Sequence, residues 1–210
     1  YSQAYELGSV TGFTKTGNKF TFECNHAKVQ VDFCREDIFR IQMSYNGDFT
    51  NPAGSDIVIN PPAVNPEVNF KEMDGYYLMS TSRVALRAYL KPLRFAMYKP
   101  DNNTLVWEEK KGLTYGKETV QYLDRGKNEY FYGGGMQNGR FSHRDKTILM
   151  RIDWNWEDGG APNPAPFYMS TNGYGALRNT YAPGQYTFTD TVKLQHAEAR
   201  FDSYYFAGES

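Results

Sequence analysis

Apolar side chains occupy every second position in four separate stretches of this chain, residues 20–24, 29–33, 39–43 and 84–90. In an extended strand, side chains at i, i+2 and i+4 point to the same face, so this spacing gives a strand one apolar and one polar face. No segment keeps a 3.6-residue apolar repeat for three turns, as a helix with one buried face would require. The alternation therefore predicts an all-β protein.

Short turn sequences separate the expected strands and indicate how neighbours pair. Asp74-Gly75 is a two-residue sequence typical of a tight hairpin, and Lys99-Pro-Asp-Asn-Asn is a second turn that returns the chain through Leu105 and Trp107. Further strands are expected at 5–14, 57–59, 119–123, 129–132, 146–152, 166–171, 174–179, 186–192, 195–201 and 203–207. Many short strands joined by turns predict that residues 1–210 form a single β-sandwich domain of mostly antiparallel strands.

Composition limits the classes of function that the chain can serve. Apolar residues make up 40% and aromatic residues 16% of the chain, which permits a sizeable core. The net charge is −1 with no basic stripe, so we expect no nucleic-acid partner, and no apolar run is long enough to cross a bilayer, so we expect no membrane partner. Cys24 and Cys34 are expected to be free thiols, and no spacing of metal ligands or cofactor motif is present, so neither a metal nor a cofactor is expected.

One stretch, residues 129–180, combines glycines, polar side chains and two tryptophans. Three consecutive glycines, residues 133–135, permit positive φ and a close approach to another surface, and a polar loop with Gln137, Asn138 and Arg140 follows. Trp154 and Trp156 are two residues apart and would face the same side of an extended chain. Aromatic rings can contact the C–H groups of a sugar, and neighbouring amide and guanidinium groups can hydrogen-bond to its hydroxyls. The combination is therefore suited to binding a sugar.

The same stretch resembles the N-terminal domain of glycoside hydrolase family 31, the α-glucosidases and α-glucosyltransferases. The resemblance rests on these motifs, in chain order: Tyr132-Gly-Gly-Gly135, Trp154-Asn155, Pro166-Phe-Tyr168, Gly173-Tyr-Gly175 with Asn179, and the closing Phe201-Asp-Ser-Tyr-Tyr-Phe-Ala-Gly208. It covers the second half of the chain well and the first half as a strand pattern. Many members have Gly-Leu-Gly-Glu where this chain has Gly134-Gly-Met-Gln137. In this departure the chain resembles a bacterial transglucosylating branch of the family.

The resemblance implies a galactose-mutarotase-like sandwich followed, after residue 210, by a catalytic barrel. In the family both catalytic carboxylates are aspartates on the barrel, one within Trp-x-Asp-Met-Asn-Glu, and this motif is absent from the 210 residues. The chain is therefore expected to have no catalytic residue, to pack on its own C-terminal barrel, and to lend a loop to the subsites for an α-glucoside oligosaccharide. The parent activity would be retaining hydrolysis or transfer of α-glucosyl units. The candidate substrate contacts are Gln137, Asn138, Arg140, Trp154, Asn155, Trp156, Glu157 and Asp158.

Other interpretations stay open at this point. The residues at 137–139 could form an ordinary turn, Glu157 and Asp158 could be solvated, and the two indoles could pack into the sandwich or onto the barrel. A free-standing carbohydrate-binding module would use Trp154, Trp156 and the loop at 137–140. A mutarotase-like epimerase would need an acid and a base such as histidine, but His26, His143 and His196 lie on separate segments and are better explained as surface or structural residues.

Overall fold

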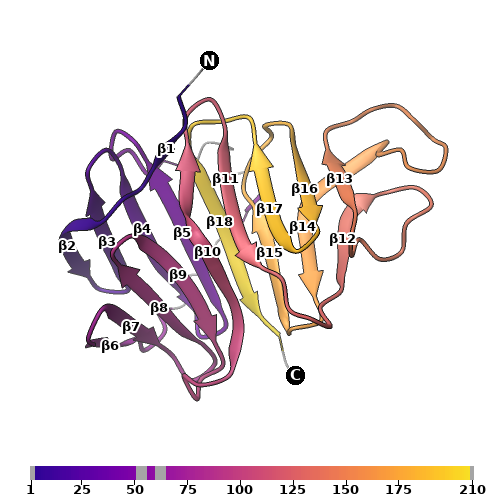
Figure 1. The fold of residues 1–210 in the computed structure, drawn as a ribbon. Coiled ribbons are helices and arrows are strands. Elements are labelled where there is room, and N and C mark those ends of the chain that lie inside the picture. Colours follow the sequence, from indigo (N-terminus) through magenta and orange to yellow (C-terminus); the bar gives the residue numbers. More distant parts are fainter. Residues whose placement is uncertain (1–2, 51–55, 60–64, 209–210) are drawn as a thin grey trace.

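Two antiparallel sheets packed face to face make up the protein (Figure 1). A computed structural model describes residues 3–50, 56–59 and 65–208. One sheet has ten strands: β13 (Thr147–Met150), β16 (Gly184–Phe188), β17 (Thr191–His196), β11 (Thr119–Asp124), β10 (Leu105–Tyr115), β9 (Leu93–Tyr98), β8 (Ala85–Leu90), β7 (Tyr76–Ser80) and β6 (Asn69–Glu72) in that order, with β1 (Tyr5–Glu6) also paired to β10. The other has eight, in the order β12 (Phe131–Met136), β14 (Asn163–Ser170), β15 (Tyr174–Arg178), β18 (Phe201–Ala207), β5 (Ile38–Ser44), β4 (Lys28–Arg35), β3 (Lys19–Cys24) and β2 (Val10–Thr16). The all-β sandwich prediction is confirmed.

The core between the sheets is largely aromatic. Phe22 meets Phe95 with ring centroids 5.9 Å apart and planes at 79°, so β3 of one sheet packs on β9 of the other. Phe131 of β12 stacks on Phe188 of β16 at 4.4 Å. Edge-to-face and offset arrangements of this kind add to the burial of each ring. The alternating apolar residues of the sequence are the residues that fill this space.

A buried polar chain also ties the two sheets together. Tyr205 of β18 donates its hydroxyl to Oε1 of Gln121 on β11 at 2.7 Å, and Gln121 Nε2 donates to Oε1 of Glu109 on β10 at 2.8 Å. The other Glu109 oxygen accepts from the Phe95 backbone N–H at 2.8 Å. All of these polar groups are buried, so the hydrogen bonds offset a desolvation penalty that would otherwise be large.

The local turn predictions hold where turn chemistry dictates the geometry. Asp74-Gly75 joins β6 to β7, the Met73 N–H donates to the Tyr76 carbonyl at 2.9 Å, and Gly75 has a φ of 83°, which a residue with a side chain rarely adopts. Cys24 and Cys34 are free thiols, as expected. Within the described residues there is no helix, and hence none that could span a membrane.

Four strand predictions are wrong. Residues 57–59 form bends rather than a strand, and the expected strand at 5–14 is broken into β1 and β2. The ranges 186–192 and 195–201 each cross a chain reversal: β16 ends at Phe188, β17 runs from Thr191 to His196, and bends follow to residue 199. Because Phe188 and Val192 face each other in the register, their period-two spacing continues in phase through the turn and hides it.

Candidate functional site

Two long loops project from one end of the sandwich, between β12 and β13 and between β13 and β14 (Figure 1). Backbone hydrogen bonds join them: the Asn138 N–H donates to the Gly160 carbonyl at 2.9 Å, and the Gly159 N–H donates to the Asn138 carbonyl at 3.0 Å. The Asn138 side chain also donates to the Asn155 carbonyl at 3.5 Å. We call residues 137–142 and 153–161 the loop pair. Its two members are thus positioned as a unit.

The second loop carries its own scaffold of side-chain-to-backbone bonds. Asp153 Oδ1 accepts from the N–H groups of Asn155 at 3.0 Å and Ala161 at 2.9 Å, and Asn155 Oδ1 accepts from the Glu157 N–H at 3.0 Å. Such bonds replace the strand ladder that an irregular segment lacks. The hydrogen bond from Asn155, with that from Ala161, holds the pKa of the Asp153 carboxyl below its usual range.

Both tryptophans of this loop are open to solvent, with 75% of Trp154 and 67% of Trp156 exposed. The chain is not extended at Trp154, which has a φ of 55° and precedes the turn at Asn155. The period-two rule therefore gives no information on which way the two indoles face. Phe141 of the first loop is also exposed and packs edge-on against Tyr132 at 5.5 Å. Exposed aromatic rings of this size can contact a ligand or another protein surface.

The other predicted contact residues divide into buried and open groups. Gln137 is buried, and its Nε2 donates to the carbonyls of Gly134 and Leu149, both at 3.0 Å, so it shapes the base of the loop. Arg140 donates to the Thr147 carbonyl at 2.7 Å and is half-buried. The exposed members are Trp154, Asn155, Trp156, Glu157 and Asp158. The structure thus brings Asn138, Arg140 and the residues from 154 to 158 into one loop pair.

The three glycines before the loop pair bring β12 close to β14. All three have positive φ, and a register irregularity separates the Gly133–Tyr168 and Gly135–Pro164 pairs. A Cβ on Gly135 would lie 2.4 Å from the Ala165 backbone nitrogen, well inside van der Waals contact. The sequence prediction of positive φ and close approach is confirmed, and the glycines here set the direction in which the loop leaves the sheet.

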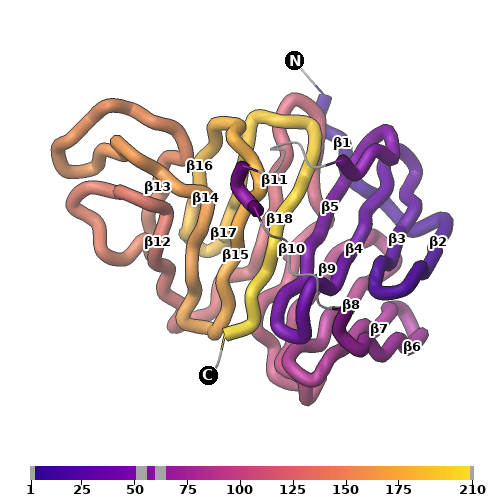
Figure 2. The backbone as a smooth tube through the Cα atoms, turned by 180° about the vertical axis from the view of Figure 1, so that it is seen from behind, coloured from indigo at the N-terminus to yellow at the C-terminus, as the bar shows by residue number. Residues whose placement is uncertain are grey.

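Sequence reasoning expected the chain to pack on a barrel, but it did not identify the apolar surface that lies beside the loop pair. On the outer side of the eight-stranded sheet, Tyr132 pairs with Met169, Phe167 pairs with Leu177, and Phe206 meets Phe167 edge-on at 6.1 Å. We call Tyr132, Phe167, Met169, Leu177 and Phe206 the apolar sheet face; Figure 2 views the molecule from the side of this sheet. Met169 is 48% exposed and the others are half-buried. The sequence signal for this surface was the run Tyr204-Tyr-Phe206, which places apolar side chains on both faces of its strand. A strand that is apolar on both faces is typically covered by other structure on both sides.

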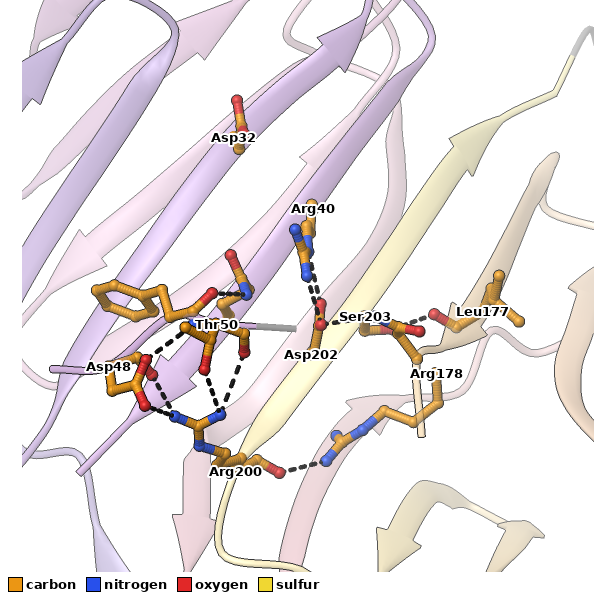
Figure 3. A network of polar contacts seen from close by, with 12 residues as sticks. Asp32, Arg40, Asp48, Thr50, Leu177, Arg178, Arg200, Asp202 and Ser203 are labelled. Atoms are coloured by element: carbon orange, nitrogen blue, oxygen red, sulfur yellow. Dashed lines mark hydrogen bonds and ion pairs between the residues drawn. The ribbon is translucent and has the colours of Figure 1, made fainter. Parts of the chain in front are cut away.

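A network of charged groups borders the apolar sheet face (Figure 3). Asp202 is buried, and its two oxygens accept from Arg40 at 2.7 and 2.6 Å, while Asn179 donates to it at 2.8 Å. Arg200 donates to the carbonyls of Asp48 at 2.8 Å and Thr50 at 3.1 Å. This network holds β18 between β5 and β15 at the border of the apolar sheet face.

The histidines offer no assembled acid–base pair. His196 is buried with both ring nitrogens engaged, by the Ala182 carbonyl at 2.8 Å and the Tyr186 hydroxyl at 2.9 Å, and desolvation lowers its pKa to about 3. His143 is buried against Phe188 with Nε2 on the Gly133 carbonyl, and desolvation lowers its pKa. His26 lies exposed in the turn between β3 and β4. Among the residues that the structure describes, no three His, Cys, Asp or Glu side chains gather as a metal site requires.

Comparisons with known proteins agree with this architecture. A family model described as the glycosyl hydrolase 31 N-terminal galactose mutarotase-like domain matches residues 28–186. Alpha-glucosidase 2 of Bacillus thermoamyloliquefaciens is 29% identical over 211 residues, a match that covers 97% of this chain and 26% of that protein.

Solved structures show the same fold at low sequence identity. A dextranase of Flavobacterium johnsoniae, solved as a mutant with isomaltotriose, has a TM-score of 0.89 at 20% identity, covering 98% of this chain and 27% of that one. A cycloalternan-forming enzyme from Listeria monocytogenes, solved with a pentasaccharide substrate, has a TM-score of 0.83 at 17% identity, covering 100% of this chain and 21% of that one. The chain thus spans about a quarter of the length of these relatives.

Proposed function

The chain belongs to the family of glycosyl hydrolase 31 N-terminal galactose mutarotase-like domains, and we propose that it is the non-catalytic sandwich of a retaining α-glucosidase or α-glucosyltransferase. In this proposal the apolar sheet face packs on a catalytic barrel that follows residue 210. The loop pair then reaches the substrate subsites. The relatives are about four times longer than this chain, which leaves ample polypeptide for such a barrel.

The observation that carries the proposal is the contrast between the apolar sheet face and the outer surface of the ten-stranded sheet. The outer face of the ten-stranded sheet is covered by charged and polar side chains such as Arg87 over the Tyr98 ring at 3.9 Å and Arg94 over the Tyr89 ring at 4.2 Å. The apolar sheet face offers aromatic and aliphatic side chains instead. A contiguous exposed apolar surface marks an interaction site, because leaving it in water is unfavourable.

The loop pair supports the second part of the proposal. Its backbone is fixed by hydrogen bonds between the loops, whereas its indoles and carboxylates stay open. A preordered loop loses little conformational entropy when it binds a ligand. The neighbouring solved proteins hold isomaltotriose and a pentasaccharide, so an α-glucoside oligosaccharide is the proposed substrate class.

The exposure of Trp154 and Trp156 also favours a second candidate, a carbohydrate-binding module that works without a barrel. The two candidates differ in what they require. A module binds sugar when the 210 residues are alone, and its affinity falls when either indole is removed. The non-catalytic sandwich of the first candidate needs the barrel before its loop pair forms a subsite.

Introducing a charge on the apolar sheet face tests the first candidate. In the isolated chain, Met169→Glu should change the free energy of unfolding by less than about 0.5 kcal/mol, because this side chain is half exposed. In the full-length protein the same change would bury an unpaired carboxylate and should weaken the domain interface by about 3 kcal/mol. Urea unfolding of both forms, followed by circular dichroism, measures the two values.

The matched control is Gln185→Glu, an exposed position on β16 of the ten-stranded sheet. It should be neutral in both forms. Equal effects of Met169→Glu in the isolated chain and in the full-length protein would show that the apolar sheet face stays in solvent, and would refute the packing proposal.

A further inference from the structure

A second concave surface lies apart from the loop pair. It is a cleft of ≈ 520 Å³ lined by Tyr5, His26, Tyr45, Tyr115, Gly116 and Ala199, which we call the tyrosine cleft. The lining comes from β1, the turn between β3 and β4, the residue after β5, the end of β10 and the residues between β17 and β18. In Figures 1 and 2, β1 lies well away from the loops that flank β13. The cleft is larger than the ≈ 340 Å³ groove beside the loop pair.

Ring packing fixes the wall of the tyrosine cleft. Tyr5 pairs with Tyr115 in the register of β1 and β10, and their ring centroids are 5.7 Å apart with planes at 31°. The Tyr5 ring also lies 6.4 Å from the imidazole of His26. Tyr115 is buried, whereas 43% of Tyr5 and 56% of Tyr45 are exposed. A fixed inner ring therefore supports outer rings that remain free to receive a ligand.

The chemistry of the lining selects a neutral ligand with both apolar and hydroxyl-bearing surfaces. Among the described residues that line the cleft, none is an aspartate, glutamate, lysine or arginine. An anionic or cationic ligand would lose its hydration there without gaining a counter-charge. Tyrosine and histidine instead offer flat apolar rings with hydrogen-bonding tips. A pyranose matches both, because its C–H face packs on a ring and its hydroxyls bond to phenol and imidazole groups.

We propose that the tyrosine cleft is a second carbohydrate site, which binds a neutral gluco-oligosaccharide independently of the loop pair and of any catalytic barrel. The choice of a glucose-based ligand rests on the proposed function, since an enzyme acting on α-glucans meets chains long enough to touch a remote surface. The cleft volume lies within the range of small-molecule sites. Contact with a distal part of the glucan would hold the substrate on the protein between turnovers.

Calorimetric titration of isomaltotriose and maltotriose onto the 210-residue chain tests this inference. The wild-type chain should bind with saturable heat. Tyr45→Ala should weaken binding by about tenfold, because it removes an exposed ring and its stacking contact. Tyr45→Phe keeps the ring and should restore most of the affinity, which separates loss of the ring from a folding defect.

A control variant defines the outcome. Tyr130→Ala removes a partly exposed tyrosine, 44% against 56% for Tyr45, that lies outside the cleft, and should leave the affinity unchanged. Absence of saturable binding, or affinity lost through the tryptophans but not through Tyr45, overturns the inference. Neither result bears on the packing proposal, which is read from Met169→Glu in the full-length protein.

Discussion

Replacing Glu109 by glutamine should change how the stability of the sandwich depends on pH. Glu109 is buried between the sheets and accepts hydrogen bonds from Gln121 and from the Phe95 backbone. Desolvation outweighs these two bonds and raises the pKa of its carboxyl from 4.5 to about 7. A glutamine has the same shape, and the Gln121 amide can reverse to donate to Tyr205 while accepting from the new amide.

Proton linkage at Glu109 determines the direction and the size of the change in the free energy of unfolding with pH. Between pH 4.5 and about 7 the folded protein retains a proton on Glu109 that the unfolded chain has released, so stability falls as pH rises through this window and is level above it. At about 1.4 kcal/mol per pH unit, the window corresponds to a loss of about 3 kcal/mol.

His196 acts in the opposite direction, and the experiment must separate the two groups. Its pKa is lowered from 6.5 to about 3, so the unfolded chain binds a proton that the folded chain does not, and stability rises with pH between these values. The two slopes oppose each other in the wild-type protein. Subtracting the free energy of unfolding of Glu109→Gln from that of the wild type at each pH removes the contribution of His196, because it is common to both proteins.

Urea unfolding followed by circular dichroism from pH 4.5 to 8 measures this difference. Relative to Glu109→Gln, the wild type should lose about 3 kcal/mol between pH 4.5 and 7.5 and remain constant above. A difference that is independent of pH would show that Glu109 has an ordinary pKa and would refute the assignment of a desolvated carboxyl.

Two other predictions concern the charged network and the loop pair. Asp202→Ala should lower the free energy of unfolding by about 3 kcal/mol, because it removes the buried carboxylate that pairs with the Arg40 guanidinium. Asp32→Ala loses only a 3.7 Å ion pair to Lys19 nearer the surface and should cost less than about 1 kcal/mol. Equal costs of the two substitutions would contradict this prediction. Trp154→Ala and Trp156→Ala should leave the unfolding of the chain within about 0.5 kcal/mol of wild type, yet lower kcat/KM of the full-length enzyme on isomaltose about tenfold; unchanged kinetics would exclude both indoles from the subsites.

Much of the fold was predictable because its signals are local. Asp74-Gly75 is a strong hairpin signal and joins β6 to β7 here, and the alternation at 20–43 corresponds to three consecutive strands that lie side by side. The position of β18 between β15 and β5 joins segments some 160 residues apart, and nothing local encodes it. The turn at Thr189-Asp190 was not predicted, because it contains neither glycine nor proline and the apolar alternation continues in phase across it.

The sequence indicated that the candidate residues lie on loops, but not how those loops pack together. The two indoles lie exposed on one loop of the pair, a point that the sequence left open, because packing into the sandwich was an equally available arrangement. The burial of Gln137 depends on the carbonyls of Gly134 and Leu149, which only the tertiary structure brings within reach. The apolar sheet face depends on the register of four strands, and it can be seen only when Phe167, Met169 and Phe206 are placed side by side.

The most direct measurement of the central proposal supplies the two parts of the proposed enzyme separately. The 210-residue chain and the barrel that we propose to follow it would be purified apart, assayed on maltose and isomaltose, and then mixed. We expect no turnover by the chain alone, and recovery of activity on mixing that Met169→Glu weakens about 100-fold. Hydrolysis or transfer of an α-glucoside by the isolated chain, or mixing that yields neither a complex nor activity, would contradict the account.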